Sequence, residues 1–403
     1  MGLKQAYFAL RDRVRFIWAQ KKYGYMPEGN VQDFKWENLN HIVILKLDGK
    51  LGDTQVMSDF YRRLKALPQR PLLSVVCPEN LASVYYDILG FDQVLVSSRK
   101  PGAGEINSLC QQIVAASQGA GHQGKVDLVL STEPAYRPRD FIFNWTLRPD
   151  FIAGCDYTVA SINLHIFHPA TYNHPVSRAF TELLNRGGVD TSDSVRYTPL
   201  FKAEHLSRAM SVLNPSAVFN EPSDQMPVAE LAARARAAAA STPLFGINPM
   251  AAPKSRRMSP EVCASIIKDI LGRSESTRVL LMCPASSREF IRAVMALMPP
   301  VTAALHGTRL LTMPENTSVS DLAALTALLD GMISVDTATV HLACSCNIAQ
   351  ICFYDNAGLE SCRWQPLSHN AQCIKFDQAL GTLPERALLE PAAAFIDQQL
   401  ASR

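Results

Sequence analysis

The chain has 403 residues, more than one hydrophobic core usually supports, so two domains are expected. Apolar residues make up 47% of it and charged residues 19%, a balance that is ordinary for globular proteins and argues against extensive disorder. The formal net charge of +2 argues against a general attraction to nucleic acid, and the lack of an apolar run of about 18 residues predicts no transmembrane helix.

Residues 3–23 carry apolar and basic side chains at helical spacing. The apolar ones recur on one face, with the cations largely elsewhere: Leu3, Tyr7, Leu10, Val14, Ile17 and Trp18. Such a helix can lie in an anionic membrane interface, or it can pack on the protein's own body with a solvated basic face. Both interpretations stay open, and charges interrupt any apolar core of the signal-peptide type. Residues 1–40 are therefore expected to form an N-terminal basic amphipathic extension.

Strand and helix patterns alternate from residue 41 onward, and residues 41–225 are expected to form the first domain. The expected strands are residues 41–47, 72–77, 94–96, 126–130 and 151–154, and the helical patterns are residues 60–67, 80–89, 105–116 and 176–184. Strands separated by helices of about ten to fifteen residues predict βαβ units and a parallel sheet. Residues 134–225, which are rich in proline, are expected to complete this domain with irregular loops.

A second alternating series is expected to form another domain of similar design over residues 226–383. Its expected strands are residues 244–247, 279–283, 310–311, 331–333 and 351–354, and its helices are residues 260–271, 287–297 and 320–329. A last helical pattern in residues 384–403 is long enough to cross back to the first domain. Two such domains predict a ligand cleft between them, at the carboxyl ends of the strands.

The turn after the first expected strand contains Gly49, Lys50, Gly52 and Asp53. The two glycines allow the backbone to approach a ligand closely. Asp53 is placed to serve as a general base, although aspartate is also a good helix N-cap. The turn matches neither the Walker loop nor the dinucleotide-binding glycine fingerprint, which disfavours a generic ATPase or NAD enzyme.

A basic loop, residues 248–257, follows the first strand of the second domain. It begins with Asn248 and contains Lys254, Ser255, Arg256 and Arg257. Three cations within four residues suit a diphosphate. Alone, such a loop is more often simply solvated.

Residues 331–343 predict a strand, a tight turn and a helix. A helix start presents unpaired N–H groups and a partial positive charge, so Asp336, Thr337 and Ala338 lie where an anion can bind. Thr337 adds a hydroxyl donor, and His341 follows within the first helical turns. The alternative is a helix whose Asp336 and Thr337 only cap its own N–H groups.

These three segments together resemble glycosyltransferase family nine, the ADP-heptose:lipopolysaccharide heptosyltransferases. Residues 46–53 (KLDGKLGD) are similar to the family's R-x-D-x-x-G-D turn, and residues 247–259 (INPMAAPKSRRMS) to its N-P-x-A-x-x-K-x-R-x-W-x segment. Residues 335–343 (VDTATVHLA) are similar to its x-D-T-x-x-x-H-x-A signature. Met258 departs from the family's frequent Trp, and residues 283–289 match the family's nucleotide-contacting loop only loosely.

The resemblance implies an α/β fold of the GT-B type, with two Rossmann-like domains facing a central cleft, and an inverting transfer that needs no metal ion or other cofactor. It implies that Asp53 is the general base and that Lys254 stabilises the leaving diphosphate. The implied donor-binding residues are Asn248, Ser255, Arg256, Glu289, Asp336, Thr337, Ala338 and His341, and the implied acceptor-side turn is Gly49, Lys50 and Gly52.

The implied substrates are a nucleotide sugar such as ADP-heptose and a lipopolysaccharide core or lipid-linked saccharide acceptor, with no nucleic acid partner. The expected location is the cytoplasm, peripheral to the inner face of the cytoplasmic membrane. Two alternatives keep the fold: a nucleotide-sugar epimerase, and a non-catalytic nucleotide-sugar-binding protein at a membrane surface.

Ten scattered cysteines favour a reducing compartment. No pair has C-x-x-C spacing, and the group from Cys344 to Cys373 is better explained by buried small side chains than by metal ligands.

Overall fold

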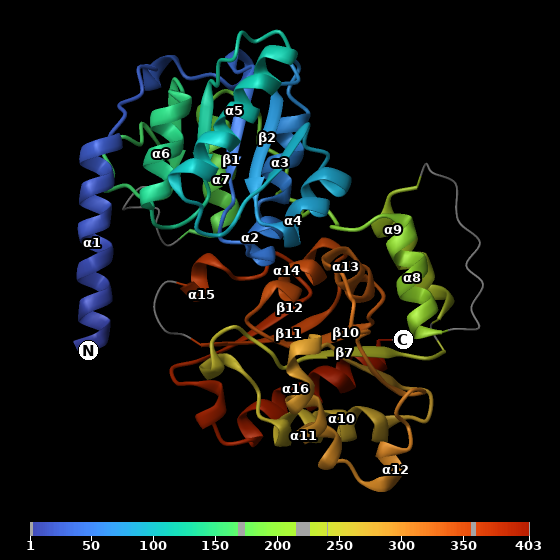
Figure 1. The fold of residues 1–403 in the computed structure, drawn as a ribbon. Coiled ribbons are helices and arrows are strands. Elements are labelled where there is room, and N and C mark those ends of the chain that lie inside the picture. The colour runs from blue at the N-terminus through green and yellow to red at the C-terminus, as the bar shows by residue number, and fades with distance from the viewer. Residues whose placement is uncertain (1–2, 168–173, 215–225, 240, 356–359, 403) are drawn as a thin grey trace. The chain divides into compact units, whose positions relative to one another are not determined.

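The computed structural model describes residues 3–167, 174–214, 226–239, 241–355 and 360–402. The chain forms two compact units (Figure 1). The first comprises residues 1–50 and 57–195, and the second residues 51–56 and 196–403. The division falls earlier than the expected boundary at residue 225, because α8 (Ala203–Leu213) packs on α13 (Val319–Ala327) and Arg208 pairs with Asp321 at 2.9 Å.

The first unit is built on a six-stranded parallel sheet in the order β3-β2-β1-β4-β5-β6. Its strands are β1 (His41–Leu45), β2 (Leu72–Cys77), β3 (Gln93–Val96), β4 (Leu128–Ser131), β5 (Phe151–Gly154) and β6 (Leu164–His165). Every residue of β1 is buried, which is why its sequence is apolar after His41 and shows no alternation.

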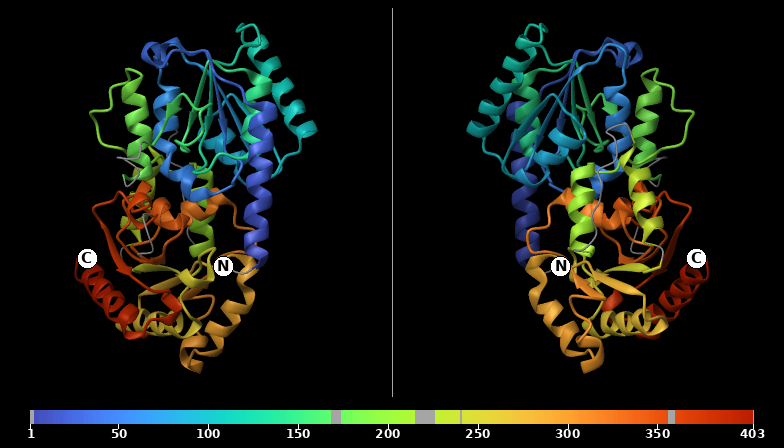
Figure 2. Two further views of the ribbon diagram at one scale, coloured as in Figure 1. Left: turned by 90° about the vertical axis from the view of Figure 1, so that its left-hand side faces the viewer. Right: turned by 90° about the vertical axis from the view of Figure 1, so that its right-hand side faces the viewer.

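Helices cover both faces of this sheet. They are α1 (Leu3–Tyr23), α3 (Ser58–Lys65), α4 (Glu79–Ser83), α5 (Ala103–Gly119), α6 (Pro138–Leu147) and α7 (Val176–Arg186), with short turns at Val31–Asp33 and Trp36–Asn38. The helix expected at residues 80–89 is α4 followed by a π-helical turn, Val84–Ile88. Helix α1 packs on α6 through its C-terminal half, and its N-terminal half extends past the other elements of the unit (Figures 1 and 2).

The second unit repeats the design with a sheet in the order β12-β11-β10-β7-β8-β9. Its strands are β7 (Leu244–Asn248), β8 (Arg278–Leu281), β9 (Leu310–Thr312), β10 (Gly331–Val335), β11 (Gln350–Asp355) and β12 (Ala371–Phe376). Its other helices are α2 (Leu51–Val56), α9 (Val228–Ala238), α10 (Pro260–Arg273), α11 (Arg288–Ala296), α12 (Pro300–Ala303), α14 (Ala338–Ser345), α15 (Glu360–Arg363) and α16 (Arg386–Ala401). Local signals fix some of these ends: the Ser259 side chain accepts from the Val262 amide ahead of Pro260, which begins α10.

Both sheets have the doubly wound order in which strand sequence reverses at one point, between β1 and β4 in the first and between β7 and β10 in the second. The expected α/β class with two Rossmann-like parallel sheets is therefore confirmed. Ligands of such sheets bind beyond the carboxyl ends of the strands at this reversal.

Helix α16 packs on α10, β10 and β11. Leu388, Phe395 and Ile396 are buried in the core of the second unit. The helix that was expected to cross back to the first domain, in residues 384–403, belongs to the second unit, which covers its apolar face. No helix within the described ranges is both long and apolar enough to cross a bilayer.

Candidate functional site

A cavity of about 410 Å³ opens at the carboxyl edge of the second sheet. Most of its lining comes from the ends of β7, β8 and β10 and the segments after them: Asn248 at the end of β7 and Ala251 after it, Ser286 after β8 and Thr337 after β10. The cavity therefore lies at the strand reversal between β7 and β10, where the topology alone predicts a ligand.

The amino end of α14 faces this cavity. Thr337, Ala338 and Thr339 line it, and Thr337 is extended, so the helix begins at the cavity wall. The first N–H groups of a helix have no partner within the helix, and they favour an anion. The loop position is fixed by Asn248, whose buried amide donates to Thr339 Oγ1 at 2.7 Å, and by Ser334, 3.2 Å from the same oxygen.

The two arginines of the basic loop make different contacts. Arg257 lines the cavity and is held by the carbonyl of Ala251, to which its Nε donates at 2.6 Å. Arg256 does not line it, and its guanidinium instead pairs with Asp336 at 2.7 Å. Two expected donor-binding residues, Arg256 and Asp336, are thus brought together as an ion pair that ties the basic loop to the turn before α14.

Three other expected residues lie outside the lining. Lys254 and Ser255 are exposed on a short 3-10 turn, Lys254–Arg256, and Glu289 is exposed in the first turn of α11. Asn248, Thr337 and Ala338 therefore meet at the cavity. The side chains of Lys254, Ser255 and Glu289 are exposed to solvent instead.

His341 is buried on α14 next to two rings. The centroids of Tyr197 and Trp364 lie 6.1 and 6.4 Å from its imidazole. Burial lowers the pKa of His341 to about 4, and its Nδ1 has no hydrogen-bond partner among the described residues. At neutral pH this imidazole is therefore uncharged, and it does not supply the counter-charge for an anion.

The glycine-containing turn marks the passage of the chain from the first unit to the second. Gly49 has a positive φ of 67°, which side chains disfavour. Gly52 lies on α2, which packs on α14, and a Cβ at Gly52 would stand 3.3 Å from Ala338 Cα and 3.6 Å from His341 Cδ2. Asp53 follows in the same helix and is 8% exposed, so the expected base lies on a helix adjacent to α14.

An ion pair between Lys46 and Asp48 lies just before this turn. Lys46 is buried and donates to Asp48. Burial favours the neutral acid, but the Lys46 ammonium and its hydrogen bond outweigh that effect and hold the pKa of Asp48 below its usual range. The ion pair leaves Asp48 as a structural carboxylate. Lys50 is exposed, and its Nζ lies 4.0 Å from Asp48 Oδ2.

The cysteines near the C-terminus are not gathered for metal binding in the described part of the chain. No three His, Cys, Asp or Glu side chains there form a group suited to an ion. Burial raises the pKa of Cys346 to about 11 and that of Cys373 to about 11, so both thiols are protonated at neutral pH.

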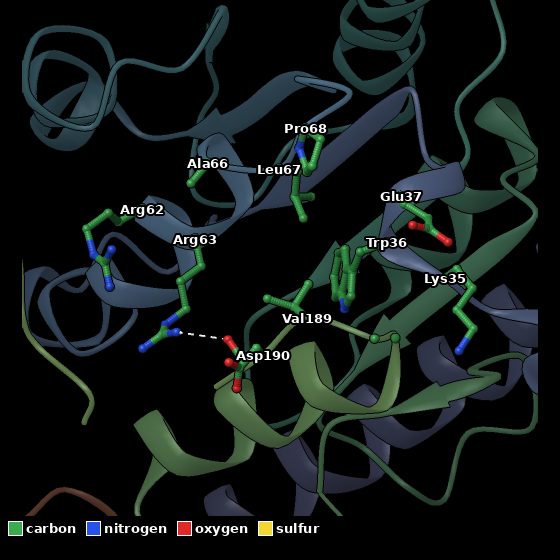
Figure 3. Close-up of a pocket in the computed structure, with 12 residues that line it drawn as sticks. Lys35, Trp36, Glu37, Arg62, Arg63, Ala66, Leu67, Pro68, Val189 and Asp190 are labelled. Carbon is green, nitrogen blue, oxygen red and sulfur yellow. Dashed lines mark hydrogen bonds between the residues drawn. The ribbon is translucent and has the colours of Figure 1, made fainter. Parts of the chain in front are cut away.

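Another cavity, about 520 Å³, lies at the opposite edge of the first sheet, before β1 and β2 (Figure 3). Arg63 points toward Asp190 in this view, and its guanidinium is bound by Asp59 at 2.7 Å, Asp193 at 2.8 Å and the Asp190 carbonyl at 3.3 Å. Two carboxylates already neutralise this guanidinium, although its Nη2 has no hydrogen-bond partner among the described residues. Because the cavity also lies at the amino edge of the sheet, we assign no ligand to it.

Comparison with known proteins agrees with the observed fold. The sequence profile of "Glycosyltransferase family 9 (heptosyltransferase)" matches residues 182–389. A comparison with curated protein sequences gives no significant match.

Solved structures share the fold across almost their whole length. The glycosyl transferase family 9 protein from Veillonella parvula is 15% identical with a TM-score of 0.68, covering 91% of this chain and 99% of that one. E. coli ADP-heptose lps heptosyltransferase II is 14% identical with a TM-score of 0.66, covering 89% and 99%. E. coli heptosyltransferase WaaC with ADP-2-deoxy-2-fluoro heptose is 14% identical with a TM-score of 0.58, covering 90% and 99%.

Proposed function

The chain belongs to glycosyltransferase family 9, and we propose on that basis that it transfers a heptose from ADP-heptose to a lipopolysaccharide core saccharide. The observation that carries the proposal is the cavity at the strand reversal of the second sheet, where the amino end of α14 and Arg257 offer N–H donors and a fixed cation. Such a combination is suited to a diphosphate. An ADP-heptose analogue bound to a protein of the same fold supports the choice of donor.

In the proposed transfer, the oxygen of an acceptor hydroxyl attacks the anomeric carbon of the heptose while the bond from that carbon to the diphosphate breaks. Asp53 accepts the hydroxyl proton, and the ADP leaves with the bonding electrons. The attack comes from the face opposite the leaving group, so the anomeric configuration inverts. Asp53 is nearly buried on α2, so its carboxylate is largely shielded from bulk solvent.

The negative charge that develops on the departing diphosphate requires stabilisation without a metal ion in this proposal. Arg257 and the amino end of α14 supply it from the cavity wall. Lys254, exposed on its short turn, supplies a further cation, since a lysine side chain is long and flexible. His341, uncharged at neutral pH, packs beneath the loop and contributes no charge.

The surface of α1 supports a peripheral location at an anionic membrane. Its exposed apolar stripe consists of Tyr7, Leu10, Val14, Ile17 and Trp18, which are 53 to 64% exposed. A second apolar stripe, Phe16, Ala19 and Tyr23, lies about half a helical turn away and packs on the first unit. The helix therefore packs through a face other than the apolar face expected from the sequence, and the exposed stripe supports the proposed contact with a lipid interface.

Purified protein incubated with ADP-heptose and a truncated lipopolysaccharide acceptor is expected to release ADP only when both substrates are present. Asp53→Asn should reduce turnover by about a thousandfold while nucleotide binding persists. A donor-only incubation that interconverts sugars would instead identify an epimerase. Nucleotide binding without turnover on any acceptor would favour a non-catalytic nucleotide-sugar-binding protein. Undiminished turnover in Asp53→Asn would show that this carboxylate is not the base.

A further inference from the structure

A cavity of about 600 Å³ in the first unit occupies the position that corresponds to the donor cavity of the second. Its lining includes Asp48 after β1, Arg99 after β3 and Glu133 after β4. It therefore lies beyond the carboxyl ends of the strands at the reversal between β1 and β4. The two sheets have the same strand order, and each has a cavity at its reversal point.

The lining of this cavity carries an excess of positive charge. It includes six cations, Arg11, Arg15, Arg99, Lys100, Arg137 and Arg139, against three carboxylates, Asp12, Asp48 and Glu133. All three carboxylates are already engaged. Arg11 binds Asp12 at 2.8 Å, Lys46 binds Asp48, and Arg139 binds Glu133.

The three carboxylates do not pair with every cation of this lining. Arg15, Arg99 and Lys100 form no ion pair with any carboxylate in the described ranges. Arg139 donates to the Arg99 carbonyl at 2.6 Å and to Glu133, but its buried Nε–H finds no acceptor among the described residues. A partly buried guanidinium with an unused, buried Nε–H donor, in a wall with unpaired cations, is suited to an anion supplied by a ligand.

One wall of the cavity comes from the N-terminal extension. Arg11, Asp12, Arg15 and Phe16 of α1 contribute to it. This wall is fixed in place, because the Phe16 ring packs edge-on against Phe141 of α6 with centroids 5.2 Å apart. Arg15 is thus presented to the cavity by a helix that is packed on the same unit.

We propose that this cavity binds the carboxylate or phosphate group of an anionic acceptor saccharide, and that α1 is part of the binding site through Arg15. The assignment of the saccharide as acceptor rests on the proposed function, whereas binding of the anion does not. The site lies at the strand edge from which the turn carrying Asp53 departs, so a saccharide held by its charged group is retained at the start of that turn.

The test is binding of three probes to the full chain by calorimetry: galacturonic acid, glucose 6-phosphate and neutral glucose. We expect one or both charged probes to bind and glucose not to bind, and comparison of the two shows whether carboxylate or phosphate is preferred. Arg15→Ala should weaken the charged probe about tenfold, as expected for loss of a hydrogen bond to a charged group, and Arg15→Lys should restore part of the affinity. Arg13→Ala is the matched control, an exposed cation of the same helix that does not line the cavity.

Equal binding of all three probes, or equal effects of Arg15→Ala and Arg13→Ala, would overturn the proposal. The proposal would also be overturned if the Arg15→Ala variant lost its affinity for anionic vesicles but kept its affinity for the charged probe. A failure of the full chain to bind ADP would reject the proposed function and leave anion binding standing. With acceptor present, Arg15→Ala should raise the acceptor KM and leave kcat nearly unchanged, because a group that only holds substrate acts on ground state and transition state alike.

Discussion

Replacement of His341 by glutamine removes a buried titrating group while keeping a neutral side chain of similar length. Burial holds the pKa of His341 at about 4 in the folded chain, against 6.5 for an ordinary histidine. The unfolded chain therefore takes up the proton first as the pH falls. The contribution of His341 to stability is complete above about pH 6.5 and is lost as the pH falls toward 4. From these two pKa values, the loss between about pH 7.5 and pH 5 is about 2 kcal/mol.

Urea unfolding of the wild type and the His341→Gln variant at these two pH values measures this loss. His41 also makes the folded chain less stable as the pH falls, because burial lowers its pKa to about 4. Asp140 opposes it: burial raises the pKa of Asp140 to about 7, so its folded form gains stability as the pH falls through 7. Both effects are common to the two proteins, and the difference between them isolates His341.

We expect the wild type to lose about 2 kcal/mol more than the variant between the two pH values. Equal pH dependence in the two proteins, or an imidazole that titrates near 6.5 by NMR, would refute the assignment of His341 as a buried neutral group. In that case a protonated imidazole would be available to the diphosphate after all.

Other changes probe the donor cavity and its supports. Arg257→Gln should weaken ADP binding by about tenfold in calorimetry, whereas Arg256→Gln should mainly destabilise the fold by removing the ion pair with Asp336; the reverse pattern would exchange their roles. Gly52→Val should lower the melting temperature by several degrees, since its side chain meets α14 within van der Waals distance, and an unchanged melting temperature would contradict that packing. Ser259→Ala should cost about 1 kcal/mol in urea unfolding through loss of the α10 cap, and a neutral result would show that the cap is not needed.

Most strands were predictable because parallel strands are buried on both faces and appear in the sequence as largely apolar runs without alternation, as in His41–Leu45 and Gly331–Val335. Strand β6, Leu164–His165, is two residues long and offers no periodicity to detect. The division after residue 195 could not be predicted from the sequence, because α8 is an amphipathic helix whose partner, α13, lies more than a hundred residues further along the chain. Helix periodicity shows that a face is covered, but not by which element.

The site was predictable to the level of segments and not of individual side chains. The segments that follow β7 and β10 do meet at one cavity, because parallel strands bring their carboxyl ends to one edge. Which arginine of the pair Arg256 and Arg257 turns toward the cavity depends on loop dihedrals and on the Asp336 partner, and adjacent positions in a sequence do not reveal this. For the same reason, the sequence predicts Arg257 only as one cation of a basic loop and not as a residue of the cavity.

Because α2 belongs to the second unit, the two units cannot be separated by a single cut of the chain. The chain changes unit after residues 50, 56 and 195, so neither unit is a continuous stretch of sequence. A fragment that begins at residue 196 would lack α2 and would expose the side of α14 against which Gly52 packs. Limited proteolysis at residue 195 should accordingly leave the two pieces associated, because the N-terminal piece still carries a helix that belongs to the fold of the C-terminal one.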